Sequence, residues 1–443
     1  MKRIYCFLLL MNLWNWNNLY VEQYQNMEKK KYITSDHVVN ALANLPQLVF
    51  EVTDACNLRC KYCAYGEFYE DYDFRESKML PTEKAIRLID YLAEYWNSNL
   101  NTSANSNVTI SFYGGEPLLN FSFIEAVVYH IQKNVHCPHR RFSYSMTTNA
   151  LLLHKYIDFL RDNKFHLLIS LDGNKENTSY RVDKAGNNSF ERIVDNVDKL
   201  KSTYPDYFRD YVNFNAVLHN RNSVESIYNF FKERYDKIPR IGELNNVGIR
   251  KDKQDEFNRT YKNSQESLQQ AEHYEEIERN IFLNAASYRS LTLFLHRYSG
   301  FVFRDYTDLL FDKETVQYIP TGTCLPFTKK MFITVNGKIL PCERIGHQFA
   351  LGKLTETGIE LDPEWIADTY NDYYVKLASM CSKCKNNKAC IQCMFNMQGL
   401  NVRPVCYGYM NEENFQNYVN RQMQFLEKHP EAYQEIMEKV IMV

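Results

Sequence analysis

The chain has 443 residues, of which 45% are hydrophobic and 24% are charged, as in ordinary globular proteins. Its 52 basic and 54 acidic side chains give a net charge of −2, so the composition predicts neither a nucleic-acid partner nor an anionic membrane partner. A chain of this length can bury a hydrophobic core and does not need its 12 cysteines as disulfide staples. The cysteines therefore indicate metal binding or catalysis in a reducing compartment, and we expect a cytoplasmic protein.

Residues 1–45 precede the first predicted strand. Lys2 and Arg3 come before an apolar run, residues 4–10, which has the look of an export signal but is too short for the ~20 residues that span a bilayer. No small-residue cleavage site follows this run. An export signal and an ordered N-terminal element are the alternatives to the interpretation that we favour, which is a chain start at Met27.

Residues 46–250 alternate apolar runs of strand length with amphipathic helical patterns. This alternation predicts parallel strands joined by helices, in a partial or complete barrel or an open doubly wound sheet. Helical patterns cover residues 81–96 and 224–235. The predicted strands are residues 48–53, 108–113, 142–147, 167–171 and 212–218, with a weaker sixth strand at 244–249.

The remainder of the chain divides into three further predicted parts. Residues 251–320 read as a mostly helical insert or linker, because a charged, Gln-rich stretch is followed by an aromatic one. Residues 321–410 hold seven of the 12 cysteines. Residues 411–443 predict two amphipathic helices separated by Pro430.

The first predicted strand runs into a loop with three closely spaced cysteines. Cys56, Cys60 and Cys63 form the pattern Cys-x3-Cys-x2-Cys, at a strand end of the kind where barrel enzymes place their active sites. Three thiolates can bind three irons of a [4Fe-4S] cluster and leave the fourth iron open. Three structural cysteines, or a zinc site with a fourth ligand from elsewhere, are the alternatives.

This cysteine pattern, with Tyr62 directly before the third cysteine, resembles the signature of radical S-adenosylmethionine (radical SAM) enzymes. The resemblance implies an α/β fold with a partial (β/α)6 TIM-type barrel over residues 46–250. It also implies that the open iron binds SAM and that reductive cleavage gives a 5′-deoxyadenosyl radical, which abstracts a hydrogen atom from the substrate. Tyr62 would then lie among the cofactor-binding residues.

Other segments match the SAM-binding motifs of the same family. Gly114, Gly115 and Glu116 follow the second predicted strand and resemble the Gly-Gly-Glu motif, whose backbone contacts the amino group of SAM. A tight turn without that role is the alternative. Ser170 and Arg181 match residues that contact SAM in sulfatase-maturating relatives, and a surface side chain is the alternative for Arg181.

The third predicted strand ends at Asn149 and Ala150, where relatives usually carry Asn-Gly. A side chain with a Cβ disfavours a left-handed backbone. The alanine therefore predicts that a positive φ is not needed at position 150.

The second group of cysteines resembles the SPASM extension of radical SAM proteins, which holds two auxiliary [4Fe-4S] clusters. A zinc ribbon is the alternative, but its two cysteine pairs are separated by ~15–20 residues and here the gap is five. The chain departs from the SPASM pattern in one spacing, because Cys390 and Cys393 are separated by two residues instead of three. The group consists of Cys324, Cys342, Cys381, Cys384, Cys390, Cys393 and Cys406.

The SPASM resemblance also implies how these cysteines divide. Cys381, Cys384, Cys390 and Cys406 would fully ligate one auxiliary cluster. Cys324, Cys342 and Cys393 would ligate the other, with an open iron or a non-cysteine ligand, since Tyr318 stands where some relatives have a fourth cysteine. The chain would then carry three [4Fe-4S] clusters.

SPASM proteins mostly modify ribosomally made peptides or proteins, and this implies a radical SAM peptide maturase with a precursor peptide as partner. An electron donor such as flavodoxin or ferredoxin would reduce the enzyme. We expect no nucleic-acid or membrane partner. The alternatives are an anaerobic sulfatase-maturating enzyme that forms formylglycine and a non-catalytic iron–sulfur or zinc protein. Glu343 matches an Asp proposed as the base in sulfatase-maturating relatives. A solvated Glu343, or one paired with Arg344 or a lysine, is the alternative.

Overall fold

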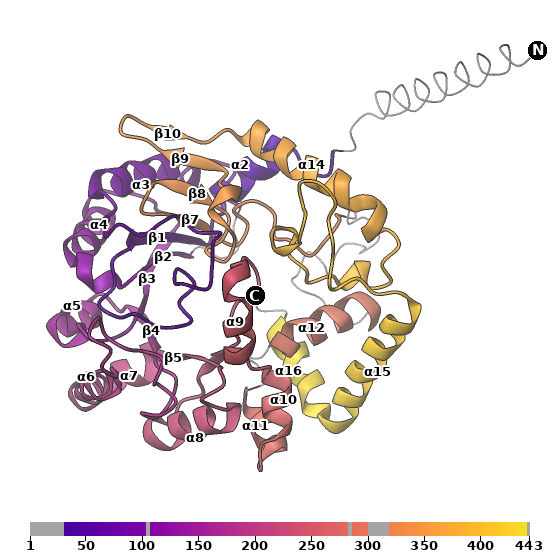
Figure 1. Ribbon diagram of the computed structural model, residues 1–443. Helices are drawn as coiled ribbons and strands as arrows, with labels where there is room; N and C mark the ends of the chain where they lie inside the picture. The colour runs from indigo at the N-terminus through magenta and orange to yellow at the C-terminus, as the bar shows by residue number, and fades with distance from the viewer. Residues whose placement is uncertain (1–30, 103–106, 282–285, 300–318, 441–443) are drawn as a thin grey trace, which may run out of the picture.

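The computed structural model describes residues 31–102, 107–281, 286–299 and 319–440 (Figure 1). The apolar run at the N-terminus and Met27 lie outside these residues, as does Tyr318. Within the described part of the chain, no helix is long and apolar enough to cross a membrane.

One sheet of ten strands passes through the described residues, in the order β10-β9-β8-β7-β1-β2-β3-β4-β5-β6. Strands β1 to β6 are neighbours in chain order and are all parallel, so each pair is joined by a crossover connection. β1 is buried along most of its length, whereas β5 alternates buried residues with half-buried or exposed ones. The bounds are β1 Gln47–Thr53, β2 Asn107–Gly114, β3 Arg141–Thr148, β4 His166–Ser170, β5 Val212–Val217 and β6 Arg240–Gly242.

The crossover helices lie on the outer side of these strands (Figure 1). The helix predicted at 81–96 forms with Pro81 as its N-cap residue, and the helix predicted at 224–235 forms with those bounds. The α/β prediction with a partial parallel barrel is thereby confirmed. The helices are α3 Thr82–Trp96, α4 Phe121–Lys133, α5 Ile157–Asp162, α6 Phe190–Thr203, α7 Pro205–Tyr211 and α8 Val224–Tyr235.

The prediction for the sixth strand was wrong in position. The strand that pairs with β5 is the short β6, and residues 244–249 form a loop. Gly248 in that loop has a φ of +71°, which is incompatible with a regular strand. Leu244 suggested a strand because it is apolar, but it is buried by aromatic side chains of the loop region instead.

The barrel sheet continues into the cysteine-rich region. Strand β7 (Met331–Ile333) pairs parallel with β1, and β8 (Lys338–Leu340), β9 (Gly352–Leu354) and β10 (Ile359–Glu360) extend the sheet by antiparallel pairing. Cys342 follows β8 after Pro341, and β8 runs antiparallel to β7 and therefore also to β1. The long helix α14 (Pro363–Cys381) then leads to the remaining cysteines.

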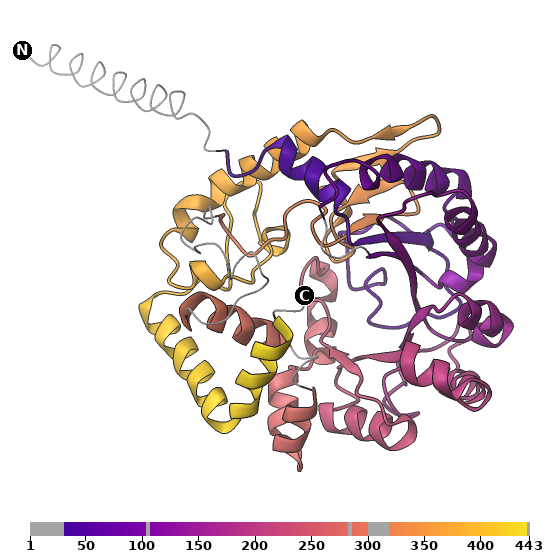
Figure 2. The same ribbon diagram turned by 180° about the vertical axis from the view of Figure 1, so that it is seen from behind.

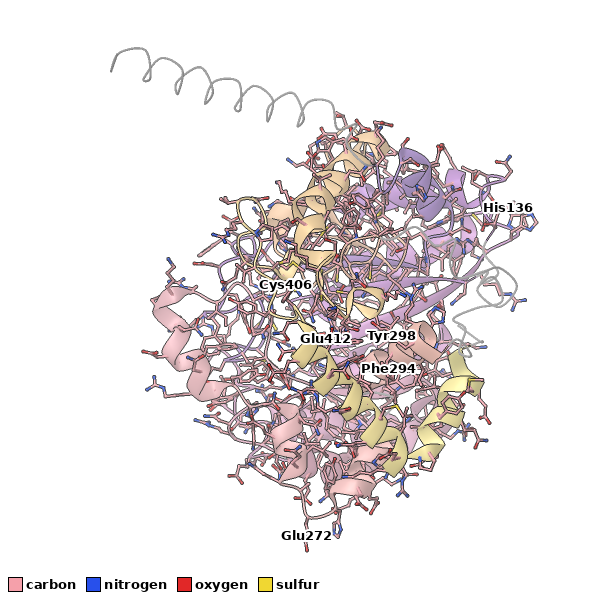
Figure 3. All side chains as sticks on the ribbon, turned by 90° about the vertical axis from the view of Figure 1, so that its right-hand side faces the viewer. His136, Glu272, Phe294, Tyr298, Cys406 and Glu412 are labelled. Carbon is pink, nitrogen blue, oxygen red and sulfur yellow. The ribbon has the colours of Figure 1, made fainter. Side chains whose placement is uncertain are left out.

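Of the other helices, α12, α15 and α16 pack together beside the barrel, α10 and α11 lie next to α8, and α2 lies against α14 (Figure 1 and Figure 2). Helix α12 and the π-helical turn η5 pack on α15, where the ring centroids of Phe294 and Tyr418 are 5.8 Å apart (Figure 3). Helix α2 packs on α14 through Asn371, which accepts hydrogen bonds from the backbone N–H groups of Tyr32 and Ile33. The bounds are α2 Ser35–Ala43, α9 Gln254–Thr260, α10 Ser264–Gln269, α11 Tyr274–Ile281, α12 Ala286–Phe294, η5 Leu295–Ser299, α15 Glu412–Lys428 and α16 Pro430–Val440.

Candidate functional site

Cys56, Cys60 and Cys63 lie in one loop, here called the first cysteine loop, just beyond the carboxyl end of β1. The loop is fixed by backbone pairing with the segment after β4. Arg59 donates its N–H to the Val182 carbonyl at 2.7 Å, and Lys61 donates to the Tyr180 carbonyl at 3.1 Å. The structure therefore brings the three predicted cluster ligands together on a rigid support.

The pKa values of the Cys56 and Cys60 thiols depend on burial and on neighbouring charged groups. Burial raises the pKa of the Cys60 thiol to about 12, with Arg181 opposing this and Cys63 and Cys56 adding to it. Burial also raises the pKa of Cys56, with smaller contributions from Glu116 and Cys63. A bound iron removes these protons, because metal ligation requires thiolates. The loop is thus a set of half-buried thiols that a positively charged metal group would deprotonate.

The two predicted glycines lie directly against this loop. A Cβ atom on Gly115 would meet the Ala55 carbonyl oxygen at 2.0 Å, and one on Gly114 would meet the Thr53 carbonyl oxygen at 2.2 Å. Gly114 also has a φ of +131°, which only glycine adopts readily. Gly115 donates its N–H to the Thr53 carbonyl at 2.8 Å. These glycines therefore let β2 approach the backbone of the first cysteine loop.

Glu116 is fully buried and joins the ends of β2 and β3. Its carboxylate accepts hydrogen bonds from Thr148 Oγ1 at 2.7 Å, from the Asn149 N–H at 2.7 Å and from the Leu118 N–H at 3.2 Å. Burial raises the pKa of Glu116 to about 7, although these hydrogen bonds oppose the shift. The Glu116 side chain therefore links the ends of β2 and β3 through hydrogen bonds to protein groups.

The expectation for Ala150 was wrong, because this residue has a φ of +62°. The backbone is held in this conformation by local hydrogen bonds. The Ala150 N–H donates to Thr148 Oγ1 at 3.0 Å, and the Leu151 N–H donates to Asn149 Oδ1 at 3.0 Å. These bonds offset the ~1–2 kcal/mol that a left-handed L-residue costs. Asn149 also directs its Nδ2 toward Cys56 Sγ at 3.8 Å.

Asp172, which the sequence analysis did not single out, organises a buried polar network at the end of β4. Arg181 donates two hydrogen bonds to its carboxylate, and the Tyr62 hydroxyl donates a third. The pKa of the Asp172 carboxyl is low, because the charge of Arg181 and these hydrogen bonds outweigh the effect of burial. His219 stacks on the Tyr62 ring with centroids 5.6 Å apart. Asp172 follows a predicted strand end directly, which was the available sequence signal.

The three residues predicted to contact SAM thus have different hydrogen-bonding surroundings. Arg181 and Tyr62 direct their polar atoms into the Asp172 network, and Arg181 also places Nη1 3.8 Å from Cys60 Sγ. Ser170 is half-buried at the carboxyl end of β4 and pairs in register with Asn215 of β5. All three lie at the same edge of the barrel as the first cysteine loop.

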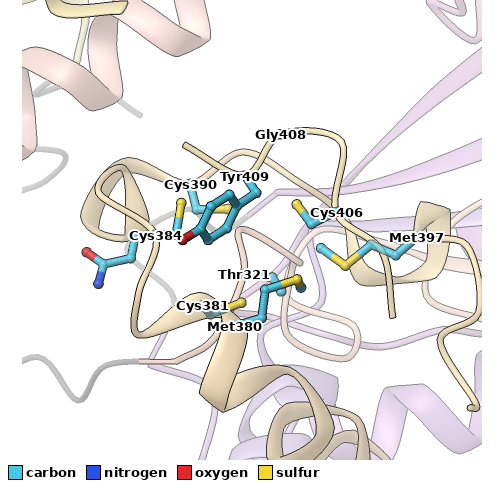
Figure 4. Close-up of a pocket in the computed structure, with 10 residues that line it drawn as sticks. Thr321, Met380, Cys381, Cys384, Cys390, Met397, Cys406, Gly408 and Tyr409 are labelled. Carbon is cyan, nitrogen blue, oxygen red and sulfur yellow. The ribbon is translucent and has the colours of Figure 1, made fainter. Parts of the chain in front are cut away.

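Four other cysteines line one small cavity (Figure 4). They are Cys381, Cys384, Cys390 and Cys406, here called the four-cysteine set. Burial and the neighbouring thiols raise the pKa of Cys381 to about 12. The backbone comes close here, because a Cβ atom on Gly322 would meet the Cys390 carbonyl oxygen at 2.0 Å.

The remaining three predicted ligands, Cys324, Cys342 and Cys393, are here called the three-cysteine set. They come from three separate segments that surround the buried Tyr370. Burial raises the pKa of the Tyr370 hydroxyl well above its usual value, with further contributions from Tyr374 and from all three thiols of this set. The structure therefore places four of the seven cysteines around one cavity and the other three near Tyr370, and their division between two clusters remains a prediction.

Each group of thiols is chemically able to bind an iron–sulfur cluster, since all 11 described cysteines are free thiols. No three His, Cys, Asp or Glu side chains of the described ranges converge to hold a single metal ion. A four-iron cluster does not need such convergence, because each thiolate binds a different iron.

Glu343 lies next to the three-cysteine set and near the first cysteine loop. Burial opposes its ionisation, but the Lys330 ammonium 3.0 Å away keeps the pKa of the Glu343 carboxyl below its usual value. Burial raises the pKa of the Tyr113 hydroxyl, and the charges of Glu343 and Cys63 add to this. Glu343 is thus an ionised carboxylate paired with a lysine, directly after Cys342 of the three-cysteine set.

Some buried polar atoms of this region have no hydrogen-bond partner among the described residues, and the sequence analysis missed them. They include the Tyr65 hydroxyl, Asp54 Oδ1, His347 Nε2, and Nε and Nη2 of Arg75. The Arg75 guanidinium lies over the Tyr65 ring at 4.3 Å from its centroid. Such atoms mark a place where a polar ligand can supply the missing hydrogen bonds.

Comparisons with known proteins agree with this geometry. Residues 50–233 match the model of the Radical SAM superfamily. The radical SAM cyclopropyl synthase TigE of Paramaledivibacter caminithermalis is 28% identical over 209 residues, 45% of this chain and 40% of that protein. The cysteine-type anaerobic sulfatase-maturating enzyme of Clostridium novyi is 30% identical over 197 residues, 44% of this chain and 49% of that enzyme. The matches thus span less than half the length of these relatives.

The solved structure of native anSMEcpe with bound AdoMet has the same fold over a longer stretch. The two structures superpose with a TM-score of 0.60 at 19% identity, over 88% of this chain and 99% of that chain. Residues 50–233 are therefore a radical SAM domain. This domain is homologous to that of the anaerobic sulfatase-maturating enzymes and of the cyclopropyl synthase.

Proposed function

We propose that this protein is a radical SAM enzyme with two auxiliary iron–sulfur clusters, which modifies a residue of a ribosomally made peptide or protein. The observation that carries the proposal is the placement of the first cysteine loop. Its three thiols lie at the carboxyl end of β1, against Gly114 and Gly115, within the radical SAM domain. When bound there, a [4Fe-4S] cluster would present an open iron to SAM and supply the electron that cleaves it.

The residues of this chain would then position and protect the reaction. The Asp172 network fixes the loop that carries Cys60, through Arg181 and Tyr62. The unpartnered atoms of Tyr65 and Arg75 would bind polar groups of SAM or of the peptide. Glu343, already ionised, would accept the proton released when the substrate radical is oxidised, as general bases do.

The four-cysteine set and the three-cysteine set would hold two auxiliary clusters, which would supply an acceptor for the electron of the substrate radical. The four-cysteine set supplies four thiols and the three-cysteine set supplies three. An external reductant such as flavodoxin or ferredoxin would deliver the electrons that start each turnover. Clusters of this kind require a reducing environment, which favours a cytoplasmic location.

A second candidate function is anaerobic sulfatase maturation, in which a Cys or Ser of a sulfatase becomes formylglycine. The match to the enzyme of Clostridium novyi and the shared fold with anSMEcpe favour it. Both candidates use the same site and differ in the protein that enters it.

The proposal is tested by reconstituting the chain with iron and sulfide under anaerobic conditions. With SAM and dithionite, it should form 5′-deoxyadenosine. A Cys56→Ala/Cys60→Ala/Cys63→Ala variant should keep about two-thirds of ~12 iron atoms and form none. Formation of 5′-deoxyadenosine by this variant would reject the site.

The two candidates are separated by their substrates. The reconstituted enzyme is incubated with a Cys- or Ser-containing sulfatase peptide and, separately, with short peptides encoded beside its gene. A carbonyl-reactive product from the sulfatase peptide would support maturation of sulfatases. A mass change confined to an adjacent-gene peptide would support the peptide maturase.

A further inference from the structure

Two tyrosines of α14 bury their hydroxyl groups without a hydrogen-bond partner in the described part of the chain. The side chains of Tyr370 and Tyr374 are 0% exposed, and neither hydroxyl oxygen has a partner. Leaving one buried hydroxyl unsatisfied costs about 1–3 kcal/mol, whereas phenylalanine would fill the same space at no such cost. Two such hydroxyls on adjacent turns therefore indicate an acceptor between α14 and its neighbours.

The surroundings of the two hydroxyls identify that acceptor. The Tyr370 ring packs on Phe395 with centroids 5.6 Å apart, and Phe395 is two residues from Cys393. The thiols of Cys393 and Cys324 are among the groups that raise the pKa of the Tyr374 hydroxyl, after burial itself. Both hydroxyls thus lie near thiols of the three-cysteine set.

Hydrogen bonds of the neighbouring residue Asn371 fix this orientation of α14. Asn371, between the two tyrosines, accepts hydrogen bonds from the Tyr32 and Ile33 N–H groups at 2.8 and 3.1 Å. Its Nδ2 donates to the Ile33 carbonyl at 2.8 Å. The helix therefore cannot turn its tyrosines toward other partners without breaking three buried hydrogen bonds.

We propose that the hydroxyls of Tyr370 and Tyr374 donate hydrogen bonds to sulfur atoms of the cluster held by the three-cysteine set. The inference rests on the proposed function, because that cluster is part of it. The two tyrosines are positioning residues for the cluster. Hydrogen bonds to cluster sulfurs stabilise the more negatively charged reduced state, and they thereby raise the reduction potential. This cluster would then be the better electron acceptor beside Glu343, with its potential set by α14.

The test uses the reconstituted chain with Cys56, Cys60 and Cys63 replaced by Ala, so that only auxiliary clusters contribute. Tyr370→Phe and Tyr374→Phe are introduced singly and together, and each protein is titrated with dithionite while the reduced clusters are followed by electron paramagnetic resonance. Tyr373→Phe is the matched control, because Tyr373 lies on the same helix, half-buried, with its ring against Lys376 and Phe349.

We expect the parent and all variants to hold about eight iron atoms. One cluster should become harder to reduce in each single variant and harder still in the double variant, while Tyr373→Phe matches the parent. Two clusters with the parent's potentials in both single variants would overturn the hydrogen bonds and leave the proposed function standing. A parent protein with only about four iron atoms would reject the second auxiliary cluster, and this inference with it.

Discussion

Arg181 donates two hydrogen bonds to Asp172, from Nε to Oδ2 at 3.1 Å and from Nη2 to Oδ1 at 3.2 Å. The pair is buried, with side-chain exposures of 7% and 0%. The same guanidinium places Nη1 3.8 Å from Cys60 Sγ. One buried ion pair therefore links the end of β4 to the first cysteine loop, and its loss should affect both stability and the cluster.

Asp172→Asn should strongly destabilise the protein, because it leaves the Arg181 charge buried without its counter-charge. Removing one partner of a buried pair costs about 3–5 kcal/mol. Urea unfolding of the metal-free protein under anaerobic conditions measures the change in the free energy of unfolding. Glu191→Gln is the control, since Glu191 forms an exposed pair with Lys175 and its loss should change little. Equal effects of the two substitutions would contradict the structural role of Asp172.

Gly115→Ala should displace the first cysteine loop, because the added Cβ would meet the Ala55 carbonyl oxygen at 2.0 Å. We expect the reconstituted variant to lose one cluster, from ~12 to about eight iron atoms, and to form no 5′-deoxyadenosine. Gly358→Ala is the matched control, since a Cβ there meets no atom within 4 Å. Normal iron content in Gly115→Ala would show that the loop tolerates the methyl group.

Glu51 gives the protein a pH-dependent stability. Burial raises the pKa of its carboxyl from 4.5 to about 7, although the Val335 N–H and Arg75 oppose this. Below pH 4.5 the folded and unfolded states both hold the proton; between 4.5 and 7 the folded state holds it more tightly. Glu51 therefore reduces stability as pH rises through this window, by about 3 kcal/mol at about 1.4 kcal/mol per pKa unit.

Glu51→Gln removes this titration and keeps an acceptor for the Val335 N–H, which lies 2.9 Å from the carboxylate. Measured between pH 5 and pH 8, the free energy of unfolding of the unsubstituted protein should fall relative to that of the variant. A difference that stays constant, or that grows in favour of Glu51 as pH rises, would contradict the raised pKa.

The sequence predicted those parts of the site that depend on local spacing. The order and spacing of the cysteines, with the resemblance to SPASM proteins, predicted three groups, and the first of these follows a predicted strand. The sequence also predicted five of the six parallel strands of the barrel, because their segments are of strand length and rich in β-branched, aromatic or other apolar residues.

Contacts between distant segments could not be predicted in this way. The hydrogen bond from Tyr62 to Asp172 joins residues 110 positions apart. The sequence analysis assigned no role to Tyr370, and only the structure shows that its hydroxyl lies near thiols of three separate segments. The prediction for Ala150 was wrong because the residue adopts a positive φ without being glycine. Backbone hydrogen bonds to the side chains of two neighbouring residues hold this conformation.

Glu343→Gln should separate proton transfer from the other steps of the proposed reaction. The glutamine keeps the size and hydrogen-bonding capacity of the side chain but cannot take up a proton, so the variant should retain its iron and its formation of 5′-deoxyadenosine. Product formation on a peptide substrate should fall ~10²-fold or more, as is typical when an acid–base group is lost. Lys330→Met is the companion variant, because it removes the ammonium that lies 3.0 Å from the carboxylate. Without that charge the pKa of Glu343 should rise, and product formation should then require a higher pH than in the unsubstituted enzyme. If Glu343→Gln forms product at the normal rate, Glu343 is not the base and its role is limited to pairing with Lys330.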